Sequence, residues 1–419
     1  MVIWLNSLRF STKLIILSLL PTLVTLVLGE RILQTKYDDI VQLTQLEQNI
    51  ERSLLLDNIA HQHAVERGLT AGYLSSKANN DKERLVKQRF IADKAWQKYD
   101  SYIQDIEHSK LDKLTQNYQI KLKQAISKKK STRGKVDTFD PNNNAFNYYS
   151  ELNSIVFDMI QVTALQITDP NLANNFFTYR NLLITKEKAG QVRGKLNGAF
   201  KSNNLAENEL VKIQANILSQ NQHFDKANDS ASEKFSEQIK VLTQSDDYKT
   251  VLNIQSIISF QDNPLTSIQG NLKDEWFSLA TSTIKDFKAI TNDMAESLLN
   301  SLNKKIRSTR AAFYTGAGAL ISLILAIFLL TWWQIKNLTT RVNAIRLTLN
   351  TVFATGDLKL RSSDTATDEI GSISSTLNDF LDNIQSLVTD IKETCVTLLT
   401  QSDDVSQVTS RNKASVDSQ

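Results

Sequence analysis

Two arginines, each accompanied by glycines, are the residues of this sequence whose types and spacing best suit chemistry. Arg67 lies in HAVERGLTAGYL (63–74), and Arg193 lies in KEKAGQVRGKLNGAF (186–200). At helical spacing, both arginines fall on stripes of apolar, small and weakly polar residues. A guanidinium group is a rigid fork of hydrogen-bond donors, so two of them on facing helices would suit a small flat oxyanion. The two stretches therefore predict an anion site.

The glycines beside these arginines are spaced four residues apart, and each lowers helix propensity by about 1 kcal/mol relative to alanine. Such spacing makes a smooth ridge on a helix, where another helix or a small ligand can come close. The candidate close-packing glycines are Gly68, Gly72, Gly190 and Gly194, with Gly198 continuing the second series. Lys186 and His63 lie on or near the same stripes and are candidates to help the arginines hold an anion.

A purely structural explanation of Arg67 stays open beside this one. In it, Arg67 pairs with a nearby carboxylate such as Glu66 or Glu187, and the glycines only allow tight helix crossing. Without an anion or a carboxylate, two guanidinium groups on facing helices would repel each other.

No metal site, cofactor or catalytic group is expected. The single cysteine, Cys395, cannot form an internal disulfide, and His61 and His63 are two residues apart, which turns their rings to different sides of a helix. Phosphorylatable histidine motifs, glycine-rich nucleotide loops and cyclase signatures are missing. The basic stretch at 121–135 lacks interleaved aromatic residues, so it predicts a solvated loop rather than a nucleic-acid partner. We expect a binding protein and not an enzyme.

The elements that position these residues are predicted to be helices throughout. The 419 residues include only 12 glycines and 4 prolines, which leaves few turns for strands. Helical periodicity and breakers predict a first helix to about residue 76, then helices at about 81–130, 142–168, 170–200, 205–243 and from 265 onward. Asp169 and Pro170 form a helix start signal. The fold class is all-α, with the helices packed as up-and-down bundles.

Two uncharged segments predict transmembrane helices at 14–33 and 311–333. Sixteen uncharged residues lie between Lys13 and Glu30, and 25 lie between Arg310 and Lys336. A cleaved signal peptide is the alternative for the first, shorter segment. Because Arg9 and Lys13 precede the first segment, residues 1–13 are expected in the cytoplasm, 34–310 outside, and the C-terminus in the cytoplasm.

VERGLTAGYL resembles the ERGxSxGYL-type signature of the NIT domain, the nitrate- and nitrite-sensing helical domain of bacterial receptors and regulators. KEKAGQVRGKLNGAF resembles the second arginine-bearing helix of that family, and the resemblance extends over roughly residues 45–300. It implies two up-and-down four-helix bundles stacked end to end. It also implies that nitrate or nitrite binds between helices through Arg67 and Arg193.

The segment 334–387 is similar to a HAMP domain. Apolar residues recur at three and four on both sides of a polar connector, as in two coiled-coil seams. The signature positions are Gly356, Asp357 and Leu358 in GDL, and Asp368, Glu369 and Gly371 in DEIG. This resemblance implies a parallel homodimer whose helices pass a small displacement through the membrane.

Residues 388–419 resemble the opening of the cytoplasmic coiled coil of methyl-accepting chemotaxis proteins. The kinase-contacting tip of that family is not present, so we expect either a fragment or a chain whose output part is missing. The resemblance implies a two-pass chemoreceptor of the bacterial inner membrane with a periplasmic sensor domain. It would signal to a chemotaxis kinase and adaptor proteins. The alternatives are a sensor histidine kinase or nucleotide cyclase whose catalytic part lies beyond residue 419, and a membrane-anchored bundle without a ligand.

Overall fold

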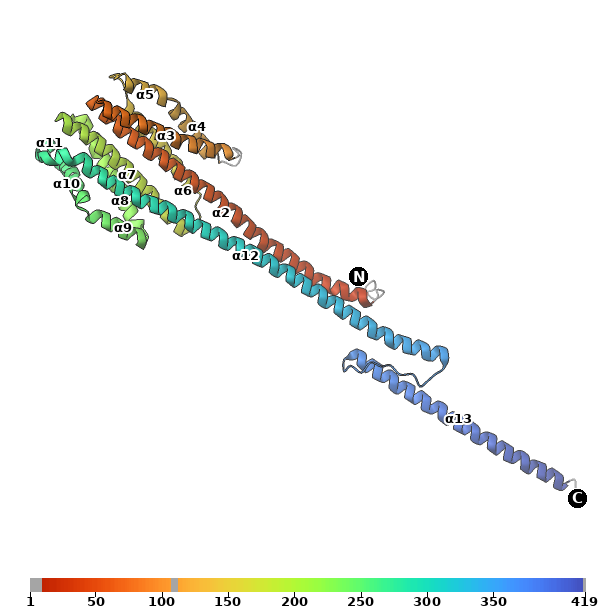
Figure 1. Ribbon diagram of the computed structural model, residues 1–419. Helices are drawn as coiled ribbons and strands as arrows, with labels where there is room; N and C mark the ends of the chain where they lie inside the picture. Colours follow the sequence, from red (N-terminus) through yellow and green to blue (C-terminus); the bar gives the residue numbers. More distant parts are fainter. Residues whose placement is uncertain (1–9, 107–111, 417–419) are drawn as a thin grey trace. The chain divides into compact units, whose positions relative to one another are not determined.

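The computed structural model describes residues 10–106 and 112–416 (Figure 1). The described residues form long helices joined by short connections, and none of them lies in a strand. The prediction of an all-α fold is therefore confirmed. Arg9 and the other residues at 1–9, the segment 107–111 and residues 417–419 lie outside the described part. The chain divides into two compact units, residues 36–312 and residues 1–35 with 313–419.

The unit at 36–312, called the sensor unit below, contains two sets of four up-and-down helices. The first set consists of α2 (Phe10–Ser76), α3 (Asn79–Asp105), α4 (Lys113–Ser127) followed by α5 (Lys129–Asp137), and α6 (Ala145–Ala164). The second set consists of α7 (Pro170–Ser202), α8 (Glu207–Ser230), α9 (Glu233–Gln244) followed by α10 (Asp246–Phe260), the short α11 (Pro264–Ser267), and α12 (Gly270–Thr355). In Figure 1 the two sets lie beside each other, with α2 and α7 running in the same direction, so the expectation of bundles stacked end to end is wrong.

Local capping explains where several of these helices begin. The Asp169 carboxylate accepts a hydrogen bond from the Leu172 amide (2.9 Å), and Pro170 occupies the first turn of α7, which confirms the predicted start. Asp112 caps α4 in the same way, through the Thr115 amide (2.9 Å). The Asp112 cap separates α4 from α3 within the helix expected at 81–130, and α5 follows α4 after Lys128 without a side-chain cap. The helix expected at 205–243 is likewise divided into α8 and α9, because Ala231 between them is extended.

The hydrophobic core shows how the two sets are joined. One large cluster takes residues from both sets, including Leu56, Tyr99, Leu122, Val156, Leu182, Ala227, Ile239 and Phe287. Toward the end that holds the α2–α3, α5–α6 and α7–α8 connections, here called the head end, the core divides. Tyr73, Leu85, Val136 and Tyr149 form a cluster within the first set, and Leu196, Ile213, Ile254 and Trp276 form one within the second. The sets thus share a core along their sides and separate at the head end.

The other unit contains the predicted membrane segments. The described residues include two helices, α2 and α12, that are long and apolar enough to cross a membrane. Their apolar side chains in these segments are exposed, as at Leu17, Leu20, Leu325 and Phe328. Burying such residues in lipid is favourable, whereas leaving them in water is not.

The polar connector between α12 and α13 (Glu369–Val416) is fixed by specific contacts. Gly356 has a φ of +69°, which an L side chain rarely adopts, and its amide donates to the Val352 carbonyl (2.9 Å). Arg341 binds the carboxylates of Asp364 (2.7 Å) and Asp368 (2.6 Å). A Cβ on Gly371 would lie only 1.7 Å from the Ala366 carbonyl oxygen, so the connector backbone occupies the space that any other residue would need.

Candidate functional site

Arg67 projects from α2 toward α7 and is almost fully buried, with 2% of its surface exposed. Its Nη1 donates to Glu187 Oε1 on α7 (2.5 Å) and to Ser150 Oγ on α6 (3.0 Å). The guanidinium also lies over the Phe146 ring, 5.1 Å from its centre. One carboxylate and one aromatic face therefore hold the Arg67 charge in place.

Glu187 is the carboxylate that pairs with Arg67, whereas Glu66 pairs with Arg133. Glu187 is buried, and it also accepts hydrogen bonds from Gln191 (2.8 Å) and Asn153 (2.9 Å). Glu66 is completely buried on the other side of α2, where Arg133 of α5 donates to both of its oxygens (2.7 and 2.8 Å). Of the two carboxylates considered from the sequence, the structure pairs Arg67 with Glu187.

Arg193 projects from α7 in the opposite direction, toward α2 and α12. Its Nη1 donates to Thr281 Oγ1 (2.9 Å), and its guanidinium lies 4.9 Å from the centre of the Phe277 ring. Among the described residues, no carboxylate comes within ion-pair distance of Arg193, and its buried Nε has no hydrogen-bond partner. Burial and the nearby Arg67 charge lower the pKa of Arg193 to about 10. In the part of the chain that the structure describes, this guanidinium is therefore a half-buried cation that no carboxylate contacts.

The glycines accommodate the arginines reciprocally. A Cβ on Gly190 would lie 3.3 Å from Nη2 of Arg67, and a Cβ on Gly68 would lie 3.3 Å from Nη2 of Arg193. A Cβ on Gly194 would lie 3.0 Å from the Phe146 ring, whereas Gly72 has no neighbouring atom within 4 Å of that position. The spaces thus hold guanidinium groups and a ring, rather than the backbone of a closely crossing helix.

Lys186 lies one position before Glu187, but it points to a different partner. Its Nζ donates to Asp57 Oδ1 on α2 (3.0 Å), and Lys288 of α12 donates to the other oxygen (3.2 Å). Burial opposes ionisation of Asp57, but the two lysines outweigh it and lower the pKa of Asp57 to about 2. Lys186 is therefore part of a bridge that joins α2, α7 and α12, and its charge is already engaged.

His63 faces the interior of the first set, away from the arginine pair. Its ring is fully buried and stacks on Tyr149, with the ring centres 6.0 Å apart. Burial lowers the pKa of His63 to about 3, and the charges of Lys129 and Arg133 add to this effect. The ring is neutral at ordinary pH and is not among the described residues that line the cavities near the arginines.

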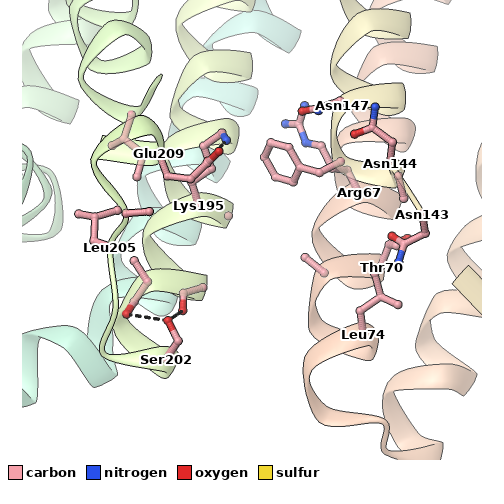
Figure 2. Close-up of a pocket in the computed structure, with 18 of the residues that line it drawn as sticks. Arg67, Thr70, Leu74, Asn143, Asn144, Asn147, Lys195, Ser202, Leu205 and Glu209 are labelled. Atoms are coloured by element: carbon pink, nitrogen blue, oxygen red, sulfur yellow. Dashed lines mark hydrogen bonds and ion pairs between the residues drawn. The ribbon is translucent and has the colours of Figure 1, made fainter. Parts of the chain in front are cut away.

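Two cavities open beside the arginine pair, one on each side. The first, called the open cleft, has a volume of about 510 Å³ and separates the two sets at the head end. Figure 2 shows Arg67, Thr70 and Asn144 on one wall, with Lys195, Leu205 and Glu209 on the other. The second, called the Arg193 cavity, has a volume of about 370 Å³ and lies between α2, α7 and α12. Arg67 lines the open cleft and Arg193 lines the other cavity, so each cavity has one of the two arginines in its wall.

The Asp57 bridge predicts a specific acid sensitivity. Because the pKa of Asp57 is lowered from 3.8 to about 2 in the folded protein, its stabilising contribution is present above pH 4 and is lost as the pH falls from about 4 to about 2. The loss amounts to roughly 2 kcal/mol. Thermal unfolding of the wild type between pH 5 and pH 2 should show it. The D57N variant is expected to be less stable at pH 5 but to lose less stability over this range, and an unchanged loss would contradict the assignment.

Several residues that shape the site gave no clear signal in the sequence. The basic stretch at 121–135 was expected to be a solvated loop, but it forms the end of α4 and most of α5. Its Arg133 binds Glu66 and Asp93, and Lys129 is largely buried beside Asp93 (2.7 Å). A helical step of four between Lys129 and Arg133 was the available signal. Asp57 and Lys288 gave none, because their partners are distant in the sequence.

Comparisons with known proteins agree with this architecture. A family model described as nitrate and nitrite sensing (NIT) matches residues 58–299. Among solved structures, the chain is similar to the structure of the NasR transcription antiterminator, with 14% sequence identity and a TM-score of 0.58. The similarity covers 88% of this chain and 98% of that one, and at this identity it shows a shared fold alone. No curated protein matches the chain.

Proposed function

This chain belongs to the NIT family of nitrate- and nitrite-sensing proteins, and from that premise we propose that it is a membrane-bound transducer that binds nitrate or nitrite at the Arg67–Arg193 pair. The observation that carries the proposal is Arg193, a half-buried side chain with a buried, unpartnered Nε and no carboxylate partner in the described part of the chain. Removing an unpaired charge even partly from water has a free-energy cost. A small anion at this position would offset that cost and accept hydrogen bonds from the planar guanidinium group.

At the proposed site, the carboxylate of Glu187 competes with a bound anion for the guanidinium of Arg67. This carboxylate accepts a hydrogen bond from Nη1 of Arg67 and is the only carboxylate among the described residues that contacts either arginine. A bound oxyanion would share or replace this contact, since it offers the same flat pair of acceptor oxygens. Binding is then an exchange of one anion for another around Arg67, with Arg193 gaining a counterion.

The test is calorimetric titration of the full chain in lipid nanodiscs with sodium nitrate and sodium nitrite. We expect saturable binding to the wild type and about tenfold tighter binding to E187Q, because glutamine removes the competing charge but keeps similar shape. E209Q is the matched control, since Glu209 pairs with Lys195 on the far side of the open cleft. No binding of either anion to the wild type, or weaker binding to E187Q, would contradict the proposal.

The relay to the other unit is the second part of the proposed function. The residues at 334–387 would act as a HAMP domain in a parallel homodimer of a two-pass inner-membrane chemoreceptor, with the sensor unit periplasmic and the chain not acting as an enzyme. Its partners would be a chemotaxis kinase and adaptor proteins. Gly356 and the ion pairs of Arg341 with Asp364 and Asp368 support this assignment, because they hold the polar connector in place between α12 and α13.

An apolar groove between α12 and α13 supports the dimer. It has a volume of about 420 Å³ and is lined by Ile345, Leu349, Ile373, Leu377 and Phe380. Ile373 and Phe380 are more than half exposed in the single chain, and covering them would remove apolar surface from water. The mass of the nanodisc-embedded protein, measured by light scattering, should correspond to two chains, and one chain per particle would exclude the dimer.

A further inference from the structure

We propose that the Arg193 cavity accepts an amphipathic monocarboxylate, that is, a carboxylate joined to an apolar ring or branched chain. This inference rests on the proposed anion site at Arg193 and names a further class of ligand for it. The cavity, its lining and its charge each support this class.

The size of the cavity exceeds what an inorganic oxyanion needs. Its volume of about 370 Å³ falls within the range of roughly 300–1,000 Å³ that is typical of pockets for organic molecules. Nitrate would occupy on the order of 60 Å³, about twice the share of one water molecule in the liquid. Nitrate alone would leave most of the space to water.

The lining of the cavity is divided into an apolar part and a cationic part. Ala64 and Val65 of α2, Phe157 of α6, and Phe277 and Ile284 of α12 supply apolar surface. These side chains offer no hydrogen bonds to water, so an apolar group that displaced the water would be favoured. The open cleft differs, because Asn143, Asn144, Asn147 and Ser202 line it with amide and hydroxyl groups.

The charge at the cavity selects an anion. Five cationic side chains line it (Arg84, Lys186, Arg193, Lys285 and Lys288), against the single carboxylate of Glu187. Asp57 engages Lys186 and Lys288, while Arg193 has no carboxylate partner among the described residues. A carboxylate head has a flat arrangement of acceptor oxygens, as nitrate has. It would accept hydrogen bonds from the guanidinium of Arg193. Its apolar body would then lie beside Ala64 and Ile284.

The experiment compares three probes on the full chain in nanodiscs: benzoate, acetate and benzamide. Acetate has the head group without the ring, and benzamide has the ring without the charge. We expect benzoate to bind at least about tenfold more tightly than acetate, because the ring removes apolar surface from water. Benzamide is expected to show no binding. Benzoate binding no tighter than that of acetate would overturn the proposal, whatever any variant does.

The A64F variant locates the binding. Its added ring would fill the apolar part of the cavity, so we expect benzoate affinity to fall at least about tenfold more than nitrate affinity. A71F is the matched control, since Ala71 lies on the same helix but lines the open cleft. Equal losses of benzoate affinity in both variants would overturn the location. Nitrate binding without benzoate binding would reject this inference alone, and benzoate binding without nitrate or nitrite binding would reject only the proposed inorganic ligand.

Discussion

Replacement of Arg193 by methionine is expected to lower the affinity for nitrate roughly a hundredfold. Methionine keeps an unbranched apolar stem against Phe277 but removes the member of the arginine pair that no carboxylate contacts in the described part of the chain. Two charge-assisted hydrogen bonds to the ligand would be lost, which corresponds to about 3 kcal/mol. Calorimetric titration of R193M in nanodiscs with sodium nitrate measures the effect directly.

Lys195 supplies the matched control for this variant. It lies two residues further along α7, is half-buried, and pairs with Glu209 (2.6 Å) on the open cleft. K195M therefore removes the same charge from the same helix without touching the Arg193 cavity, and its nitrate affinity should stay within about twofold of the wild type. Equal losses in R193M and K195M would mean that the overall positive potential holds the anion, and that no specific Arg193 site exists.

Replacement of Arg67 by methionine is expected to destabilise the sensor unit by about 3–5 kcal/mol. The variant leaves Glu187 buried without its cation, and breaking a buried ion pair from one side carries a cost of this size. For a unit of this length, the midpoint of thermal unfolding should fall by roughly 10 °C. Circular dichroism of the full chain in nanodiscs would follow the helix content during heating.

A second substitution tests the cause of that loss. The double variant R67M/E187Q has no buried charge at position 187. The substituted amide can still form hydrogen bonds with Asn153 and Gln191. Most of the lost stability should therefore return. If the double variant is as unstable as R67M, the cause is lost packing against Phe146 rather than the unpaired carboxylate. An R67M variant as stable as the wild type would show that the ion pair contributes little.

Most of the long helices, and the stripe of its own helix on which each arginine lies, could be predicted from the sequence. Low glycine and proline content fixes the all-α class, and α2 and α7 end within two residues of the predicted positions. The repeated arginine and glycine spacing also predicted that Arg67 and Arg193 would each lie on the core-facing stripe of its own helix. Periodicity sufficed here because it depends on residues that are neighbours along one helix.

The partners of the charged residues could not be predicted in the same way. Glu66 and Glu187 were equal candidates for Arg67, and the choice depends on which side of α2 faces α7. That rotation places Glu66 against Arg133 and leaves Glu187 for Arg67. Lys186 was expected to assist with the anion, and the structure shows it bound to Asp57, 129 positions away in the sequence. Contacts across such distances depend on helix rotation and packing, which local patterns do not encode.

The burial of the Asp57 bridge has a consequence for the medium in which the protein works. Asp57 and Lys186 are 8% and 6% exposed, so dissolved ions cannot come between them. The Debye length at 0.15 M salt is about 8 Å, but this screening acts mainly on charges that face water. The link between α2, α7 and α12 should therefore keep its strength from fresh to saline surroundings. Changes in ionic strength would then alter how fast an anion arrives, without loosening the three helices that receive it.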